Sequence, residues 1–278
     1  MDIQIEHLKS KTNLLQKKFG HPDYRAIYGT GCITQPDVCL ILMNPTARNV
    51  SVHKNWKGLR ASWLGTKNIW KLLYKLDLLN EQTFAATQNK KPQDWDDTFA
   101  RDLYTKLASK KVFLTNLARS TQPDARPISN SIFAACTPLM EEEIDFIKPK
   151  VVITFGNQVS SALLKRPVKV SESRRKPFVL KTKNDNYITY ATYYPVGMGM
   201  MNMGKAVEDV KWILSKHATK KTSKLSTKRL VKLQRATLIA STGSSIRLSG
   251  SKVTNEQVEQ ILNKISKPSV QKQGHRTN

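Results

Sequence analysis

The sequence predicts an α/β protein: a three-layer α/β/α domain with a central four-stranded parallel sheet, followed by a basic helical C-terminal extension. Short apolar runs, each as long as a buried strand, occur four times in residues 1–214. Helical patterns follow these runs, and strands that alternate with helices form parallel sheets covered on both faces. After residue 214 the composition shifts to Ser, Thr and Lys, which indicates a linker.

Each strand and helix is placed by its pattern of apolar residues. The strands are predicted at Val38–Met43, Val112–Thr115, Val151–Phe155 and Tyr187–Thr192. The helices are predicted at Ile69–Leu79, Ile132–Ile147, Gln158–Leu164 and Ala206–Leu214. In open parallel sheets the ligand binds at the carboxyl ends of the strands, so we expect the functional residues in the loops that follow them.

Residues 215–278 are predicted to form a basic linker and a small helical module. They hold 10 Lys and 4 Arg against 2 Glu, whereas residues 1–214 hold 32 basic and 19 acidic side chains. Thr254 and Gln257 have the spacing of a capping box, which marks the start of a helix. The face that this helix would bury consists of Val258, Ile261, Leu262 and Ile265.

The composition restricts the classes of function. The net charge of +25 at pH 7 indicates a polyanionic partner, with nucleic acid favoured over a membrane. The longest apolar run, near Val151–Phe155, is far shorter than the roughly 20 residues of a membrane helix, and Met1–Gln4 do not open a signal peptide. Cys32, Cys39 and Cys136 are irregularly spaced, which favours a reduced protein without disulfides. We expect a cytoplasmic monomer that binds nucleic acid.

Neutral side chains and turn residues follow all four predicted strands. The segments are Met43–Asn49, Asn116–Arg119, Gly156–Gln158 and Tyr193–Gly199. They hold amides, glycines and prolines, but no Ser/His/Asp set, no Cys/His pair, no pair of carboxylates and no phosphate-binding loop. Amides around a turn suit the recognition of a flat, hydrogen-bonding ring and do not suit acyl or phosphoryl transfer.

Short segments around these strand ends occur in a characteristic order. They are Leu42–Pro45, Ser62–Gly65, Val112–Leu117, Cys136–Leu139, Ile147–Gly156 and Ala191–Pro195. Together they resemble the uracil-DNA glycosylase superfamily over residues 25–214. Within that resemblance, the first segment corresponds to the water-positioning loop in its Asn-Pro form. The second corresponds to the segment whose aromatic residue stacks on the flipped base, and the last to a motif in which His-Pro-Ser is usual.

The resemblance implies a role for each residue of the site. Asn44 orients the attacking water, and Tyr194 stands where the family's His stabilises the departing base. Asn116 reads the edge of the pyrimidine and Trp63 stacks on its ring. Thr46 stands where a bulky Tyr usually blocks a 5-methyl group, which implies a roomier pocket. A phenol can donate a hydrogen bond, yet losing charge stabilisation of this kind can cost about 10²–10³ in rate.

The resemblance also implies how the chain contacts DNA. A glycine-rich loop would clamp the backbone while methionines fill the vacated stack, and nearby cations would contact phosphates. The expected DNA-binding residues are Arg119, Gly197, Met198, Gly199, Met200 and Lys205. No cofactor and no metal are expected, because Cys136 matches one cysteine of the family's iron–sulphur branch while Ser120 stands where another is usual.

Each site residue also has a purely structural alternative. Asn44 and the following proline form an ordinary turn in many proteins, and Asn116 is placed to cap a helix. Trp63 beside a helix start is often a core residue, and Tyr194 is able to pack with its hydroxyl on a backbone carbonyl. His53 is a further candidate for the missing His.

The sequence therefore predicts a monofunctional DNA glycosylase. It would flip out a pyrimidine, either uracil or a 5-modified pyrimidine, and hydrolyse the N-glycosidic bond to leave an abasic site. Two alternatives stay open. One is an antiviral glycosylase that excises a bulky modified cytosine from phage DNA, and the other is a catalytically silent DNA-binding or damage-sensing relative.

Overall fold

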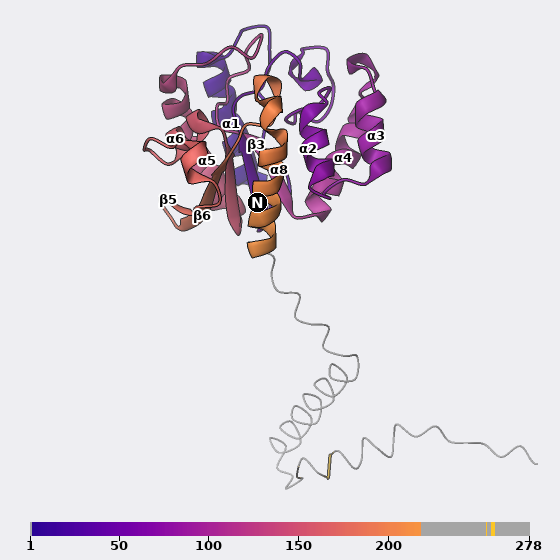
Figure 1. Cartoon of the computed structure of the whole chain (residues 1–278). Helices are drawn as coiled ribbons and strands as arrows, with labels where there is room; N and C mark the ends of the chain where they lie inside the picture. Colours follow the sequence, from indigo (N-terminus) through magenta and orange to yellow (C-terminus); the bar gives the residue numbers. More distant parts are fainter. Residues whose placement is uncertain (1, 218–253, 255–256, 259–278) are drawn as a thin grey trace, which may run out of the picture. The chain divides into compact units, whose positions relative to one another are not determined.

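The computed structural model describes residues 2–217, 254 and 257–258 (Figure 1). The helices are α1 (Asp2–Phe19), α2 (Asn68–Lys75), α3 (Glu81–Asn89), α4 (Asp97–Ser109), α5 (Asn130–Ile147), α6 (Asn157–Leu163), α7 (Val170–Ser173) and α8 (Met203–His217). The strands are β1 (Thr30–Gly31), β2 (Val38–Leu42), β3 (Val112–Asn116), β4 (Val151–Phe155), β5 (Phe178–Lys181) and β6 (Asn186–Thr192). Short 3-10 helices are η1 (Val50–Val52), η2 (Pro92–Asp94) and η3 (Gly197–Asn202).

The sheet confirms the predicted α/β class. Its strand order is β1-β3-β2-β4-β6-β5, and the inner strands β3, β2, β4 and β6 are parallel, as the sequence predicts. The sheet differs from the prediction in having an antiparallel strand at each edge. The apolar pattern does not reveal these edges, because β1 has only two residues and β5 buries only one of its four side chains.

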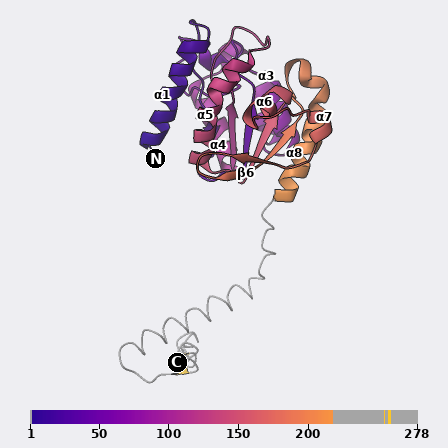
Figure 2. The ribbon, with the colours of Figure 1, turned by 90° about the vertical axis from the view of Figure 1, so that its left-hand side faces the viewer.

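Helices cover both faces of the sheet. Alternate side chains of β2 point to opposite faces, as the strand repeat requires. Leu40 and Leu42 pack with residues of α2, α4 and α8, whereas Cys39 and Ile41 pack with residues of α5 and α6. Figure 1 shows α2 and α4 on one side of the sheet and α5 and α6 on the other. Figure 2 shows α1 beside α5, on the outside of that layer.

The apolar pattern places the four predicted helices and misses others. α2 ends at Lys75, before the predicted Leu79, because Asp77 adopts a left-handed conformation with φ of +60°. The pattern misses α1, whose buried face is largely polar, with Thr12 and Gln16 beside Leu8. α4 does carry a usable signal, since its buried residues repeat at helical spacing: Ala100, Leu103, Tyr104 and Leu107.

The chain divides into two compact units, residues 1–218 and 219–278. α8 continues to His217, three residues beyond the predicted end at Leu214. Of the predicted C-terminal module, the capping box lies within the described residues. The Thr254 N–H donates to Gln257 Oε1 at 2.9 Å, and the Gln257 N–H donates to Thr254 Oγ1 at 3.4 Å. Val258 of the predicted apolar face is also described and is 2% exposed, whereas Ile261, Leu262 and Ile265 lie outside the described residues. Among the described helices, none combines the length and apolarity of a membrane span.

Candidate active site at the carboxyl ends of the strands

The pairing of β2 with β3 brings Asn44 and Asn116 to the same edge of the sheet. Leu42 is the register partner of Asn116. The two chains stay paired beyond the strands, because the Leu117 N–H donates to Leu42 O at 2.8 Å and the Ala118 N–H donates to Met43 O at 2.9 Å. Both asparagines are buried, with 6% and 3% of their surface exposed. The two amides therefore stand at the ends of neighbouring strands.

Ser62 holds the amide of Asn116. The Ser62 hydroxyl donates to Asn116 Oδ1 at 2.6 Å, and the Tyr104 hydroxyl donates to the carbonyl of Ser62. Asn116 Nδ2 is buried and has no hydrogen-bond partner within the described part of the chain. A buried donor without a partner is uncommon in folded proteins and marks a place where a ligand can supply the acceptor. Asn116 also caps no described helix, because the helix that follows β3 is α5, which begins at Asn130 with Ser129 as its N-cap.

The loop that carries Asn44 is held from two sides. The Gln122 N–H donates to Pro45 O at 3.1 Å, and the Ala47 N–H donates to Gln122 O at 2.9 Å. Thr46 lies between these two bonds and is half-buried. His53 Nε2 lies 3.0 Å from Ala47 O. The ring of His53 thus supports the backbone of this loop.

Asn49 joins this loop to the segment that contains Trp63. Its Nδ2 donates to Ala61 O at 2.8 Å, while its Oδ1 accepts from the Ser51 N–H at 3.0 Å. Trp63 follows in a left-handed conformation with φ of +69°, and its carbonyl accepts from Trp70 Nε1 at 3.1 Å. The indole of Trp63 is half-buried, and its Nε1 has no partner among the described residues. The strained backbone is fixed by its neighbours, a common feature of functional sites.

Tyr194 lies two residues after β6, and two glycines lie close to it. A Cβ on Gly156 would lie 3.4 Å from Tyr194 Cβ, and a Cβ on Gly199 would lie 2.1 Å from Tyr194 O. Burial raises the pKa of the Tyr194 hydroxyl above its ordinary value. The phenol therefore stays protonated through the neutral range and is available as a hydrogen-bond donor.

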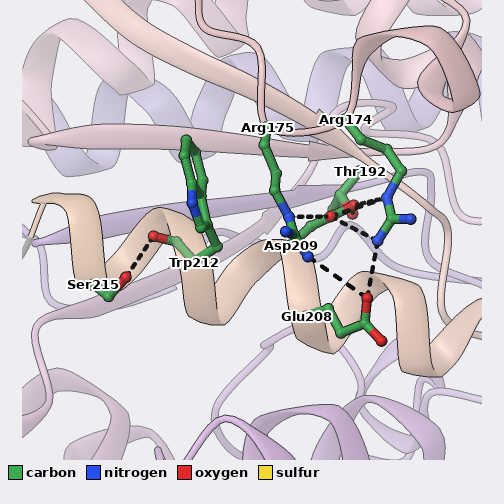
Figure 3. A network of polar contacts seen from close by, with 7 residues as sticks. All are labelled: Arg174, Arg175, Thr192, Glu208, Asp209, Trp212 and Ser215. Carbon is green, nitrogen blue, oxygen red and sulfur yellow. Dashed lines mark hydrogen bonds and ion pairs between the residues drawn. The ribbon is translucent and has the colours of Figure 1, made fainter.

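A buried carboxylate fixes the strand that leads to Tyr194 (Figure 3). Asp209 of α8 is fully buried, and its Oδ2 accepts from the Thr192 hydroxyl at 2.9 Å. Arg174 Nε donates to both Asp209 oxygens at 3.0 Å, and Arg175 Nε donates to Oδ1 at 3.1 Å. These bonds raise the pKa of Arg174. Asp209 thus ties α8 and the 174–175 segment to the end of β6.

Arg119 does not have the position expected of a DNA contact. Only 1% of its surface is exposed, and its Nη2 forms an ion pair of 2.5 Å with Glu143 Oε2. The same carboxylate oxygen accepts from the Thr115 hydroxyl at 2.9 Å. A guanidinium enclosed in this way cannot reach a phosphate, so this expectation is wrong. The position of Arg119 in a strand-end loop suggested a surface role, but its side chain points toward Glu143 of α5.

The remaining expected DNA contacts lie in or near η3. Gly197 is exposed with φ of +58°, Met200 is 49% exposed, and the neighbouring Met201 is 95% exposed. Met198 and Gly199 belong to the same 3-10 helix. The exposed Lys205 places Nζ 5.0 Å from the centre of the Tyr193 ring, and Arg174 Cζ lies 5.7 Å from it. Their role toward DNA stays a prediction.

The residues around Cys136 do not fit an iron–sulphur cluster, which requires cysteine thiolates. Cys136 Sγ accepts from the Arg119 N–H at 3.3 Å, and burial raises the pKa of this thiol. The buried hydroxyl of Ser120 has no partner within the described residues. In residues 2–217, no three His, Cys, Asp or Glu side chains converge as a metal site would require. The absence of a metal from the whole protein stays a prediction.

Comparison with known proteins identifies the family of this chain. A model of the uracil DNA glycosylase superfamily matches residues 28–218. The chain is similar to the type-4 uracil-DNA glycosylase of Sulfurisphaera tokodaii, with 27% identity over 108 residues, which are 37% of this chain and 49% of that protein. It is also similar to the type-4 uracil-DNA glycosylase of Saccharolobus solfataricus, with 29% identity over 93 residues, 32% of this chain and 43% of that protein.

The chain belongs to the uracil DNA glycosylase superfamily, because the family model covers more than half of its length. The segments matched to the two relatives span only about half of those proteins. The resemblance noted from the strand-end motifs is confirmed at the level of the family.

Several residues that hold the site could not be found from the sequence. Ser62 lies in a segment that resembles the family, yet nothing in the pattern shows its bond to Asn116. Tyr104 belongs to the apolar stripe of α4, where a hydroxyl carries no special signal. Asn49 and Asp209 form their bonds only after distant segments meet.

The close approach of Gly199 to Tyr194 gives a test of this geometry. In Gly199→Ala the added Cβ meets the carbonyl of Tyr194, so the backbone must shift, and we expect a loss of about 1–3 kcal/mol in the free energy of unfolding. Gly204→Ala is the matched control, because no atom lies within 4 Å of its Cβ position in α8. Alanine there should stabilise by up to about 1 kcal/mol. Urea unfolding measures both, and equal effects would contradict the packing described.

The network around Asp209 gives a second test. Asp209→Asn removes the charge that two arginines and a hydroxyl share, so we expect a loss of about 2–3 kcal/mol in stability. Glu208→Gln is the control, because its carboxylate is largely exposed although it pairs with Arg174 at 3.2 Å. Exposed pairs contribute at most about 1 kcal/mol. Similar melting temperatures for the two variants would show that Asp209 does not anchor this edge.

Proposed function

We propose that the chain is a monofunctional DNA glycosylase that flips out uracil or a 5-modified pyrimidine and leaves an abasic site. The observation that carries this proposal is the pair of buried amides at the ends of β2 and β3. Asn116 presents an Nδ2 that has no partner in the described part of the chain, and Asn44 stands two residues beyond the register partner of Asn116. Family membership supports the same reaction class.

The residues divide the reaction between binding the base and positioning water. Asn116 would hydrogen-bond the pyrimidine edge, and Trp63 would stack on the ring, a contact worth roughly 1–3 kcal/mol in other base–aromatic pairs. Asn44 would orient a water toward C1′ of the sugar; as a neutral amide it positions the water without deprotonating it. The C1′–N bond breaks as the water oxygen bonds to C1′. The bonding electron pair leaves with the base, and the proton that the water loses is transferred to the base, so that a neutral base and an abasic sugar result.

Tyr194 and Thr46 would set the rate and the range of bases. The protonated phenol of Tyr194 would donate to the departing base, in place of the imidazole usual at this motif. Thr46 is smaller than the tyrosine expected in a strict uracil enzyme, so the pocket would admit a substituent at the 5-position. This is the reason to retain 5-modified pyrimidines among the substrates. A bulky modified cytosine of phage DNA is an alternative substrate that the assay below tests.

The proposed partner is DNA. η3, with Met200 and Met201 exposed, would enter the gap left by the flipped nucleotide. Lys205 and the basic residues 215–278 would add affinity for phosphates that does not depend on sequence. We also propose that the protein is a monomer in the cytoplasm. Its chain would consist of a glycosylase domain at 1–214 and a basic module at 215–278.

A second candidate function is a DNA-binding or damage-sensing relative without turnover. The specific observation in its favour is Tyr194, because the residue lacks the imidazole that usually stabilises the leaving base. This candidate retains the base pocket and the DNA surface but predicts no abasic product.

An abasic-site assay separates the two candidates. Matched oligonucleotides would carry uracil, a mismatched thymine, 5-hydroxymethylcytosine or its glucosylated form, and hot alkali would cleave the strand at each abasic site. We expect strand breaks on at least one substrate. Asn44→Ala should lower kcat by about 10²-fold or more because the water loses its orientation, while DNA affinity is retained.

Asn55→Ala is the control for that experiment, because Asn55 is exposed and lies only a few residues after the loop that contains Asn44. It should leave kcat unchanged. Tight binding with no breaks on any substrate would reject catalysis and favour the silent candidate. An equal loss of kcat in both variants would reject the role given to Asn44.

A further inference from the structure

We propose that Ser62 is a positioning residue that fixes the orientation of the Asn116 amide. In this orientation the site offers a hydrogen-bond donor where the base carries its 4-substituent, and so selects a 4-carbonyl over a 4-amino group. The inference rests on the proposed function, because it concerns how that site chooses its base.

The orientation of the amide follows from the needs of a buried hydroxyl. Ser62 is 1% exposed, and its Oγ lies 2.6 Å from Asn116 Oδ1. Within the described residues, the Ser62 hydroxyl donates its proton to Asn116 Oδ1. If the amide were turned over, Ser62 Oγ would accept from Nδ2 and its own proton would lose that acceptor. Buried polar hydrogens are rarely left unpaired, so the serine holds Oδ1 toward itself.

This orientation leaves Nδ2 free to face a ligand. Nδ2 is buried without a partner in the described part of the structure, whereas Oδ1 keeps a second lone pair beside the bond from Ser62. The amide thus offers a ligand the N–H groups of Nδ2 as donors and one lone pair of Oδ1 as acceptor. Uracil and its 5-substituted forms present the complement, a 4-carbonyl that accepts and an N3–H that donates. Cytosine and its modified forms present a 4-amino donor and an unprotonated N3, so both contacts would be mismatched.

Ser62 is itself held in place. The hydroxyl of Tyr104, which is 3% exposed, donates to the Ser62 carbonyl. The preceding carbonyl, Ala61 O, accepts from Asn49 Nδ2 at 2.8 Å and from Ser51 Oγ at 3.1 Å. Two successive backbone carbonyls are therefore anchored, and the serine has little freedom to turn away from Asn116.

The test compares excision of uracil and cytosine placed in the same oligonucleotide, together with inhibition by the free bases. The wild type should favour uracil. In Ser62→Ala the amide is free to rotate, so we expect the uracil-to-cytosine ratio of kcat/KM to fall about tenfold, the effect of one lost neutral hydrogen bond. Inhibition by free uracil should weaken by a similar factor. Ser62→Thr keeps the hydroxyl and should restore the ratio.

Two further variants separate specificity from folding. Thr137→Val removes a buried hydroxyl from α5 that donates to Phe133 O at 2.9 Å, and should leave the base ratio unchanged. Tyr104→Phe releases the Ser62 carbonyl and should shift the ratio in the same direction as Ser62→Ala, which keeps the test decisive if Ser62→Ala does not fold.

The outcomes distinguish this inference from the proposed function. A folded Ser62→Ala that keeps the wild-type ratio would overturn the role of Ser62 while leaving the glycosylase intact. A wild-type enzyme that prefers a 4-amino base would also overturn the role of Ser62 and leave the proposed glycosylase activity intact. A wild type that excises none of the bases would overturn the proposed function itself, and the inference with it.

Discussion

The hydrogen bonds that continue from β2 to the chain after β3 are the constraint on which the site depends. Leu117 and Ala118 donate to Leu42 and Met43 beyond the regular strands, so the two polar strand ends remain side by side. Because the inner strands are parallel, the carboxyl ends of β4 and β6 lie at the same end of the sheet. Loops that are far apart in sequence therefore lie at the same end of the sheet.

The converging groups are neutral, and the charges are arranged around them. Asp209 is compensated by two arginines, and Arg119 is compensated by Glu143 beneath the sheet edge. Neither pair leaves an uncompensated buried charge, which would be costly in this position. The proposed base-binding residues are amides, a phenol and an indole. Such groups suit a flat uncharged base, while the excess of lysine and arginine suits the phosphates that carry it.

Most of the inner sheet could be predicted because its strands are buried on both faces and read as continuous apolar runs. The edge strands could not, because β5 alternates and β1 is too short. The sequence does place Asn44, Asn116 and Tyr194 at or just after the ends of strands, and their roles stay proposals. Ser62 and Asp209 were missed because their partners come from distant segments, and Arg119 was misplaced because its sequence position does not show on which side of the loop it points.

The most direct measurement is a crystal structure of the protein with a DNA duplex that carries a non-hydrolysable 2′-fluoro-deoxyuridine. The account predicts that the base leaves the helix and lies between the ends of β2 and β3. Asn116 Nδ2 would then lie about 2.9 Å from its 4-carbonyl oxygen, the usual N–H···O distance, with the Ser62 hydroxyl still on Oδ1. A base that stays stacked in the duplex, or one that binds with the Asn116 amide unengaged, would contradict it.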